Sequence, residues 1–164
     1  MSKIFIAHRG NISGPNPARE NQPTYINEAL NLGYHVEIDV WLLGSKYYLG
    51  HDKPTYIVSP QLMSHYRVWS HCKNLAALDV LTKNPEANCF AHNTDDYVLT
   101  SKSYIWTHYN SKEKLTNNSI IVLPERTNGR MDLNQCAGFC SDNIEEYRLQ
   151  YGQLMMEHVE IQVD

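Results

Sequence analysis

The sequence has no long hydrophobic run. No apolar stretch approaches the roughly 18 residues that a transmembrane helix needs. The apolar run at the amino terminus stops at His8 and Arg9, which makes it too short for the core of a secretory signal peptide. We therefore expect a soluble, cytoplasmic protein without a transmembrane segment.

Positive charge and cysteine are also scarce. The chain carries 14 Lys and Arg against 18 Asp and Glu, a formal net charge of −4, so it lacks the basic field that holds nucleic acid nonspecifically. We expect no nucleic-acid scaffold binding. The cysteines include no C-x-x-C pair and are too few for a disulfide scaffold, so they are interpreted as reduced thiols of the core. They are Cys72, Cys89, Cys136 and Cys140.

The chain of 164 residues has the length of one domain, and no repeat or long linker divides it, so residues 1–164 are expected to form a single domain. Short β-rich runs alternate with helix-like segments, which favours a parallel α/β sheet, either open or closed into a barrel. The predicted strands are residues 3–7, 35–43, 46–49, 67–71, 88–91, 104–107, 119–123 and 137–140. The predicted helices are residues 23–32 and 74–81.

Polar residues follow the predicted strands, where ligand sites of α/β proteins lie. The first strand leads into His8 and Arg9. In the second, alternation places Glu37 and Asp39 on one face, where two neighbouring carboxylates in a covered strand repel unless a cation compensates them. A divalent metal fits this pattern, and an edge strand with a wet acidic face is the alternative.

A Gly-Ser pair at residues 44–45 predicts a hairpin that brings His51 back toward the carboxylates. Strict pairing would place His51 opposite Ile38, so it faces the carboxylates only if Gly50 forms a bulge or the pairing has ended. The strand at residues 67–71 adds His71, a metal ligand or a core histidine, and Lys73, a phosphate contact or a solvated lysine. Further strand ends carry His92, Glu125 and Asp142, each more typical of a rim residue.

The order His8-Arg9-Gly10, Glu20-Asn21, Glu37-Ile38-Asp39 and His51-Asp52 resembles the glycerophosphodiester phosphodiesterase family, relatives of phosphatidylinositol-specific phospholipases. The match is dense over residues 3–52 and thinner beyond, where residues 71–73 and 138–142 resemble two later strands of the family. The resemblance implies a compact, trimmed TIM-type (β/α) barrel with about seven to eight mostly parallel strands and short helices, because a full barrel needs about 200 residues or more.

The resemblance also implies roles for individual residues. His8 and His51 would be the acid/base pair, Arg9 and Lys73 would bind the phosphate, and Glu20, Asn21 and Asp52 would support them. Glu37 and Asp39 would hold one divalent metal together with His71, which stands in place of the third carboxylate of the family. The family uses Mg²⁺ or Ca²⁺, whereas a ligand set with an imidazole also suits Mn²⁺, Fe²⁺ or Zn²⁺.

We therefore expect a metal-dependent phosphoric diester hydrolase or lyase that acts on a small-molecule phosphodiester. A stable diester anion needs a cation on its oxygens, a base for the nucleophile and an acid for the leaving alkoxide, and this constellation offers all three. Two alternatives stay open. One is a catalytically inactive phosphate- or metal-binding relative, and the other is a different metal-dependent barrel enzyme, such as an aldolase or isomerase.

Overall fold

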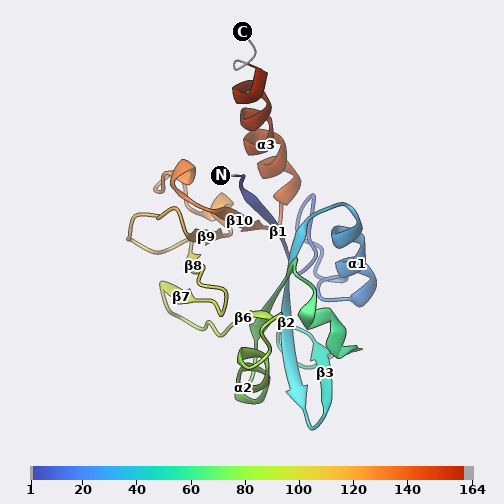
Figure 1. Ribbon diagram of the computed structural model, residues 1–164. Helices are drawn as coiled ribbons and strands as arrows, with labels where there is room; N and C mark the ends of the chain where they lie inside the picture. Colours follow the sequence, from blue (N-terminus) through green and yellow to red (C-terminus); the bar gives the residue numbers. More distant parts are fainter. Residues whose placement is uncertain (1, 161–164) are drawn as a thin grey trace.

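The computed structural model describes residues 2–160, and the side chains of residues 2–152. Its ten strands form one sheet (Figure 1). The strands are β1 (Ile4–His8), β2 (His35–Leu43), β3 (Lys46–Leu49), β4 (Tyr56–Val58), β5 (Val68–Cys72), β6 (Asn88–Phe90), β7 (Tyr97–Leu99), β8 (Ile105–His108), β9 (Ser119–Val122) and β10 (Gly138–Ser141). The α-helices are α1 (Pro23–Asn31), α2 (Leu75–Thr82) and α3 (Ile144–Glu160), and the 3₁₀ helices are η1 (Pro60–Ser64), η2 (Pro124–Arg126) and η3 (Leu133–Gln135).

The sheet is mixed. The main strand order is β4-β3-β2-β1-β10-β9-β8-β7, and β5 branches from β2 to pair with β6. Strand β1 pairs in parallel with β2 and β10, β9 with β10 and β8, and β5 with β2 and β6. The pairings of β2 with β3, β3 with β4 and β7 with β8 are antiparallel.

The expected TIM-type barrel is wrong. The sheet does not close, because the described part of the chain has no strand pairing between β6 and β7. Both strands are only three residues long, and β7 folds back as an antiparallel hairpin on β8. Among the described residues, Ser101 supplies the hydrogen bonds that link the hairpin to β6: its N–H donates to Cys89 O (2.8 Å), and its Oγ accepts from Cys89 N–H (2.9 Å). A barrel would also need more helices than the three found in residues 2–160.

Local sequence signals account for helix α1, which covers the sheet beside β2 (Figure 1). Pro23 occupies its first turn, where a missing N–H costs nothing. At its carboxyl end Gly33 has φ +87°, and Tyr34 N–H donates back to Ala29 O (3.1 Å), a left-handed cap that favours glycine. The buried face of α1 consists of Tyr25, Ile26, Ala29 and Leu30.

Two apolar clusters lie on the two faces of the sheet. One packs the helices against the sheet and includes Ile26, Val36 and Phe139. The other lies on the opposite face, and we call it the inner layer: Ile6, Trp69, Phe90, Trp106, Ile120, Val122, Leu123 and Cys140. All four cysteines are buried, as expected for core thiols. None of the helices within residues 2–160 is both long and apolar enough to cross a membrane.

Candidate functional site

The parallel strands bring polar side chains together at their carboxyl ends, on the same face as the inner layer. Alternation along β2 turns Val36, Ile38 and Val40 to the helix side, so Glu37 and Asp39 point the other way. The register then sets their neighbours: His8 on β1 lies beside Glu37, and His71 on β5 lies beside Asp39. Strand β2 is central, so the alternative of a wet acidic edge does not apply.

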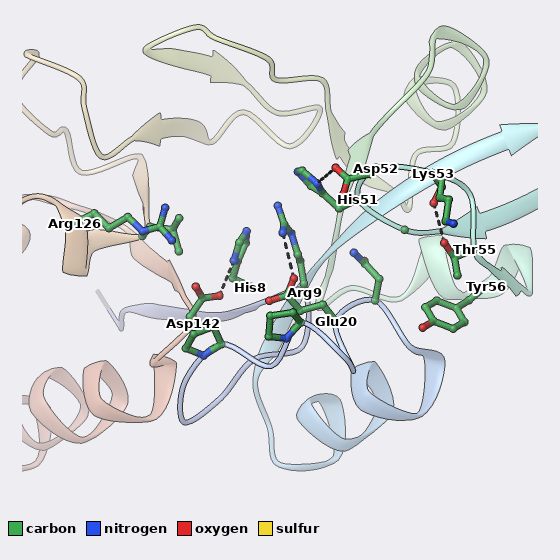
Figure 2. Close-up of a pocket in the computed structure, with 15 residues that line it drawn as sticks. His8, Arg9, Glu20, His51, Asp52, Lys53, Thr55, Tyr56, Arg126 and Asp142 are labelled. Carbon is green, nitrogen blue, oxygen red and sulfur yellow. Dashed lines mark hydrogen bonds and ion pairs between the residues drawn. The ribbon is translucent and has the colours of Figure 1, made fainter.

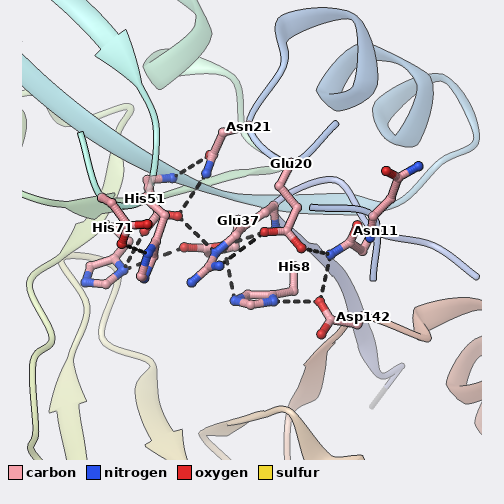
Figure 3. Close-up of polar contacts among 12 residues, drawn as sticks. His8, Asn11, Glu20, Asn21, Glu37, His51, His71 and Asp142 are labelled. Atoms are coloured by element: carbon pink, nitrogen blue, oxygen red, sulfur yellow. Dashed lines mark hydrogen bonds and ion pairs between the residues drawn. The ribbon is translucent and has the colours of Figure 1, made fainter. Parts of the chain in front are cut away.

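Glu37, Asp39 and His71 form a compact triad (Figure 3). The two carboxylate residues are only 2% and 0% exposed. His71 Nδ1 lies 3.1 Å from Asp39 Oδ1 and 3.7 Å from Glu37 Oε1. Each residue offers one possible ligand atom, and these atoms all lie within 4.8 Å of one another. Three side chains placed in this way could hold a small cation.

Arg9 and Asn21 hold the other oxygens of the two carboxylates. Arg9 N–H donates to Glu37 Oε2 (3.2 Å), and Arg9 Nε lies 3.1 Å from Asp39 Oδ2. Asn21 donates to the same Oδ2 through Nδ2 (2.9 Å) and accepts from Asp39 N–H through Oδ1 (2.9 Å). Arg9 and Asn21 reach these positions with left-handed backbone, at φ 53° and 62°. Consequently one oxygen of each carboxylate is fixed and the other is turned toward His71.

The remaining oxygen, Asp39 Oδ1, is held by ion pairs. It is buried, and it lies 3.1 Å from His71 Nδ1 and 3.7 Å from Lys73 Nζ. Burial would raise the pKa of Asp39, but His71 and Arg9 outweigh it and hold the pKa well below its ordinary value. Burial would lower the pKa of His71, whereas Asp39 and Glu37 raise it to about 9. At neutral pH His71 is therefore charged and pairs with Asp39, and a cation bound at this point would displace the proton of its Nδ1.

His8 is oriented by the carboxylate of Asp142, the residue directly after β10. Its Nδ1 lies 2.7 Å from Asp142 Oδ1, and its Nε2 points toward Glu37 Oε2 at 4.0 Å. Asn11 bridges Asp142 (2.8 Å) and Glu20 (2.9 Å), and Glu20 also accepts from Arg9 (3.2 Å). Burial would lower the pKa of His8, but Asp142 and Glu37 raise it above its ordinary value.

His51 lies on the loop after β3, at the rim of the same site. The β2–β3 pairing has the predicted register and ends at Val40 and Leu49, so the condition for His51 to leave the ladder is met. Gly50 follows with φ +149°, and His51 Nδ1 lies 2.7 Å from Asp52 Oδ1. The His51 side chain is 43% exposed.

A cavity of about 590 Å³ joins these groups (Figure 2). His8 and Arg9 line it together with Glu20, Asn21, His51 and Asp52. His71 and Lys73 line a neighbouring cavity of about 500 Å³, where His71 Nε2 lies 2.9 Å from His92 O. The structure thus gathers the residues proposed from sequence at one end of the sheet. His8, Arg9, His51, His71 and Lys73 line the two cavities, whereas Glu37 and Asp39 are buried and line neither.

Three residues have a larger part in this site than their sequence context indicates. Arg126 and Lys53 line the first cavity, and Arg126 is brought there by η2, directly after β9. Asp142, expected at the rim, orients His8. The sequence signal available for Arg126 was its position just after a predicted strand, in the sequence Pro-Glu-Arg. In the structure the preceding residue, Glu125, accepts a hydrogen bond from Ser141 Oγ (2.9 Å).

Comparison with known proteins identifies no relative. No family model matches the sequence, and neither the curated proteins nor the solved structures contain a significant match.

Proposed function

We propose that the protein is a metal-dependent phosphoric diester hydrolase that acts on small diesters of the glycerophosphodiester type. One observation carries the proposal: a buried Glu37–Asp39–His71 triad lies next to a cavity that contains both His8 and His51. The diester class comes from the resemblance of residues 3–52 to glycerophosphodiester phosphodiesterases. The site geometry supports the chemistry without that resemblance, because three possible metal ligands, two imidazoles and the cationic side chains of Arg9 and Lys73 lie close together.

Glu37, Asp39 and His71 would hold a divalent cation. The closeness of the three ligand atoms and the fixed orientation of both carboxylates fit such an ion. Two carboxylates and one imidazole suit Mn²⁺, Fe²⁺ or Zn²⁺ better than Mg²⁺ or Ca²⁺, which prefer all-oxygen shells. When bound, the cation would neutralise phosphate oxygens and polarise the phosphoryl group.

The cationic side chains around the triad would bind the phosphate. Arg9 lines the larger cavity beside His8, while Lys73 lines the smaller one beside His71. Both contact Asp39. They would therefore bind the phosphate from two sides of the triad, and the overall surface need not be basic. This placement explains how a chain of net charge −4 would bind a phosphodiester.

The two histidines would move the protons. With Asp142 accepting from Nδ1–H, the Nε2 of His8 is left free to take a proton from the attacking water. His51 on the opposite rim would protonate the leaving alkoxide, with Asp52 holding its other nitrogen. Because His8 is buried and fixed and His51 is exposed, their removal should affect different steps.

A second candidate is a phosphate-binding module without turnover. The observation that favours it is internal charge compensation: Arg9, Lys73 and His71 already surround the two buried carboxylates. A site neutralised by its own side chains can be stable without a cation. The two candidates differ in whether a divalent ion binds and whether any diester is cleaved.

The test is a hydrolysis assay on chelator-treated protein with Mn²⁺, Zn²⁺, Mg²⁺ or Ca²⁺ added back. The substrates are bis(p-nitrophenyl) phosphate and glycerophosphodiesters, with phosphorus NMR of the products. We expect turnover only with added metal, and a loss of about 10²-fold or more for His8→Ala and His51→Ala. Nitrophenolate needs little protonation, so His51→Ala should lose less activity on bis(p-nitrophenyl) phosphate than on an alkyl diester.

His65→Ala is the matched control, because His65 lies outside both cavities of the site and stacks on Tyr66 (5.1 Å). It should retain wild-type activity. Absence of turnover on every diester with every metal would overturn the hydrolase proposal and favour the binding module. Wild-type turnover of an alkyl diester by both histidine variants would overturn the proposed roles of His8 and His51.

A further inference from the structure

A separate cavity of about 640 Å³ lies at the amino ends of the strands, opposite the candidate catalytic site. Its lining includes His35 at the start of β2, Asn88 at the start of β6 and Tyr104 just before β8. The inner layer lies between this cavity and the carboxyl ends of the strands. In the pairing of β2 with β5, Glu37 lies opposite Trp69, and Asp39 and His71 form the pair two residues nearer the carboxyl ends. The cavity shares no lining residue with the two cavities of the candidate catalytic site.

Aromatic side chains form the walls of this cavity. The Trp69 ring lies 5.1 Å from Tyr104 at an interplanar angle of 54°, and 6.2 Å from His35 at 62°. His35 also meets Tyr66 edge to face, at 6.3 Å and 83°. Tyr66 is 76% exposed, although large aromatic side chains usually bury most of their area. Trp69 is only 2% exposed and supports the other rings from below, so the exposed ring of Tyr66 is the main face offered to a flat ligand.

Two polar groups in the cavity have capacity left for a ligand. Asn88 is 7% exposed, yet its Oδ1 is buried without a hydrogen-bond partner among the described residues. An unsatisfied buried carboxamide is costly, and its broad terminal torsion lets it turn either its oxygen or its nitrogen toward the cavity. Trp69 Nε1–H donates to His35 Nδ1 (3.1 Å). His35 therefore carries its own proton on Nε2, which is left as a donor.

We propose that this cavity binds a planar heteroaromatic ring of the nucleobase type. Aromatic walls stack on such a ring, and a carboxamide pairs with the neighbouring donor and acceptor atoms on its edge. Adenine suits the site best, since asparagine binds its amino group and ring nitrogen together. A plain hydrocarbon ring has no polar edge that could pair with Asn88. A phosphate ion has no flat face that could stack on the aromatic side chains.

The test is calorimetric titration of the full chain with adenosine, together with tryptophan fluorescence, to which Trp69 contributes along with Trp41 and Trp106. We expect saturable one-to-one binding of adenosine and none of ribose or benzyl alcohol. Tyr66→Ala and Asn88→Ala should each weaken binding by about tenfold, as loss of a stacking or pairing group does. A short oligoadenylate that binds no tighter than adenosine identifies a free nucleoside as the source of the ring, and tighter binding identifies a single strand.

Two controls locate the binding. Tyr97→Ala removes another exposed tyrosine, on β7, that lines none of the three cavities described above, so the affinity of this variant for adenosine should equal that of wild type. His51→Ala changes only the opposite site and should also bind normally. Tyr66 is exposed, so Tyr66→Ala should fold even if Asn88→Ala does not. Absence of saturable binding, or wild-type affinity in Tyr66→Ala, would overturn the inference.

Discussion

His8 Nδ1 and Asp142 Oδ1 lie 2.7 Å apart although 134 positions separate them in the chain. The contact joins the ends of β1 and β10, which pair in parallel from Ile4–Gly138 to Ala7–Ser141. The first and last strands along the chain, which are neighbours in the sheet, therefore set the orientation of the His8 imidazole. His8 is thereby held with one nitrogen occupied and the other directed toward Glu37.

Asp142→Asn tests this relationship. Removing the charge should weaken the orientation and basicity of His8, and kcat on an alkyl diester should fall by about 10²-fold with KM little changed. The metal-induced rise in melting temperature should remain, because Asp142 is not one of the triad residues. Asp132→Asn, an exposed carboxylate outside both site cavities, is the control and should keep wild-type kinetics.

The same variant carries a pH prediction. Burial would raise the pKa of Asp142, but its hydrogen bond with His8 lowers it below the ordinary value of 3.8. A depressed carboxyl pKa contributes stability that is present above the unfolded value and lost as pH falls through the folded value. The difference in melting temperature between wild type and Asp142→Asn should therefore be full near neutral pH and shrink below pH ~4. A difference that grew on acidification would contradict this.

Local patterns predicted the framework around the site well. Strand β2 runs over the predicted residues His35–Leu43 and β3 over Lys46–Leu49, and the two-residue turn fixed their register. Period-two alternation was sufficient to place Glu37 and Asp39 on the face opposite the helices. These features depend on the geometry of residues close together in the chain, so the local sequence pattern predicts them directly.

Closure of the sheet was the main error, because it depends on contacts distant in sequence. Strand β7 (Tyr97–Leu99) and strand β4 (Tyr56–Val58) are three residues long and were not predicted. Helix α3 was also missed, although Ile144, Tyr147 and Tyr151 follow the three- and four-residue spacing of a helix face and pack on the core. No local pattern indicates that Ser101 takes the place of a strand pairing beside β6. Arg126 escaped notice for the same reason: only the tertiary fold brings η2 to the cavity.

Asp39→Asn tests the cation site. The change is nearly isosteric but removes the charge that Arg9 and Lys73 surround, so even metal-free protein should lose about 2 kcal/mol or more of its free energy of unfolding. The decisive readout is the metal response. Wild type should melt at higher temperature when Mn²⁺ or Zn²⁺ is added after chelation, and Asp39→Asn should lose most of that rise.

Asp79→Asn is the control for this measurement, because Asp79 is an exposed carboxylate on α2 that pairs only with Lys83 (2.9 Å) among the described residues. Its metal response should equal that of wild type. An unchanged melting curve of wild type with every divalent ion tried would mean that the triad binds none of them.

Gly50→Ala tests whether the loop geometry delivers His51. Gly50 has φ +149°, and an added Cβ would lie 2.1 Å from Lys53 O, so the loop must move. We expect a loss of about 2 kcal/mol or more and a clear fall in activity. Gly44→Ala is the matched control: φ is +59° but no atom lies within 4 Å, so it should cost about 1 kcal/mol and leave activity intact. Equal activity losses in both variants would show that the Gly50 loop has no special role.

Arg126→Ala tests the cavity residue that the sequence did not indicate. Arg126 lines the cavity of about 590 Å³ that also contains His8 and His51. Its guanidinium lies 5.7 Å from the Tyr109 ring, and it forms no ion pair with any of the described residues. An unpaired guanidinium facing a proposed phosphate site should strengthen substrate binding without taking part in proton transfer. The variant should raise KM for a glycerophosphodiester by about tenfold while kcat changes little.

Arg130→Ala is the control for Arg126→Ala, since Arg130 lies four positions later and lines a different cavity. Its KM should equal that of wild type. The salt dependence gives a second readout: the KM ratio between Arg126→Ala and wild type should shrink at high ionic strength, because an exposed charge is screened. A large loss in kcat with unchanged KM would instead assign Arg126 to the reacting atoms, and unchanged kinetics would remove it from the site.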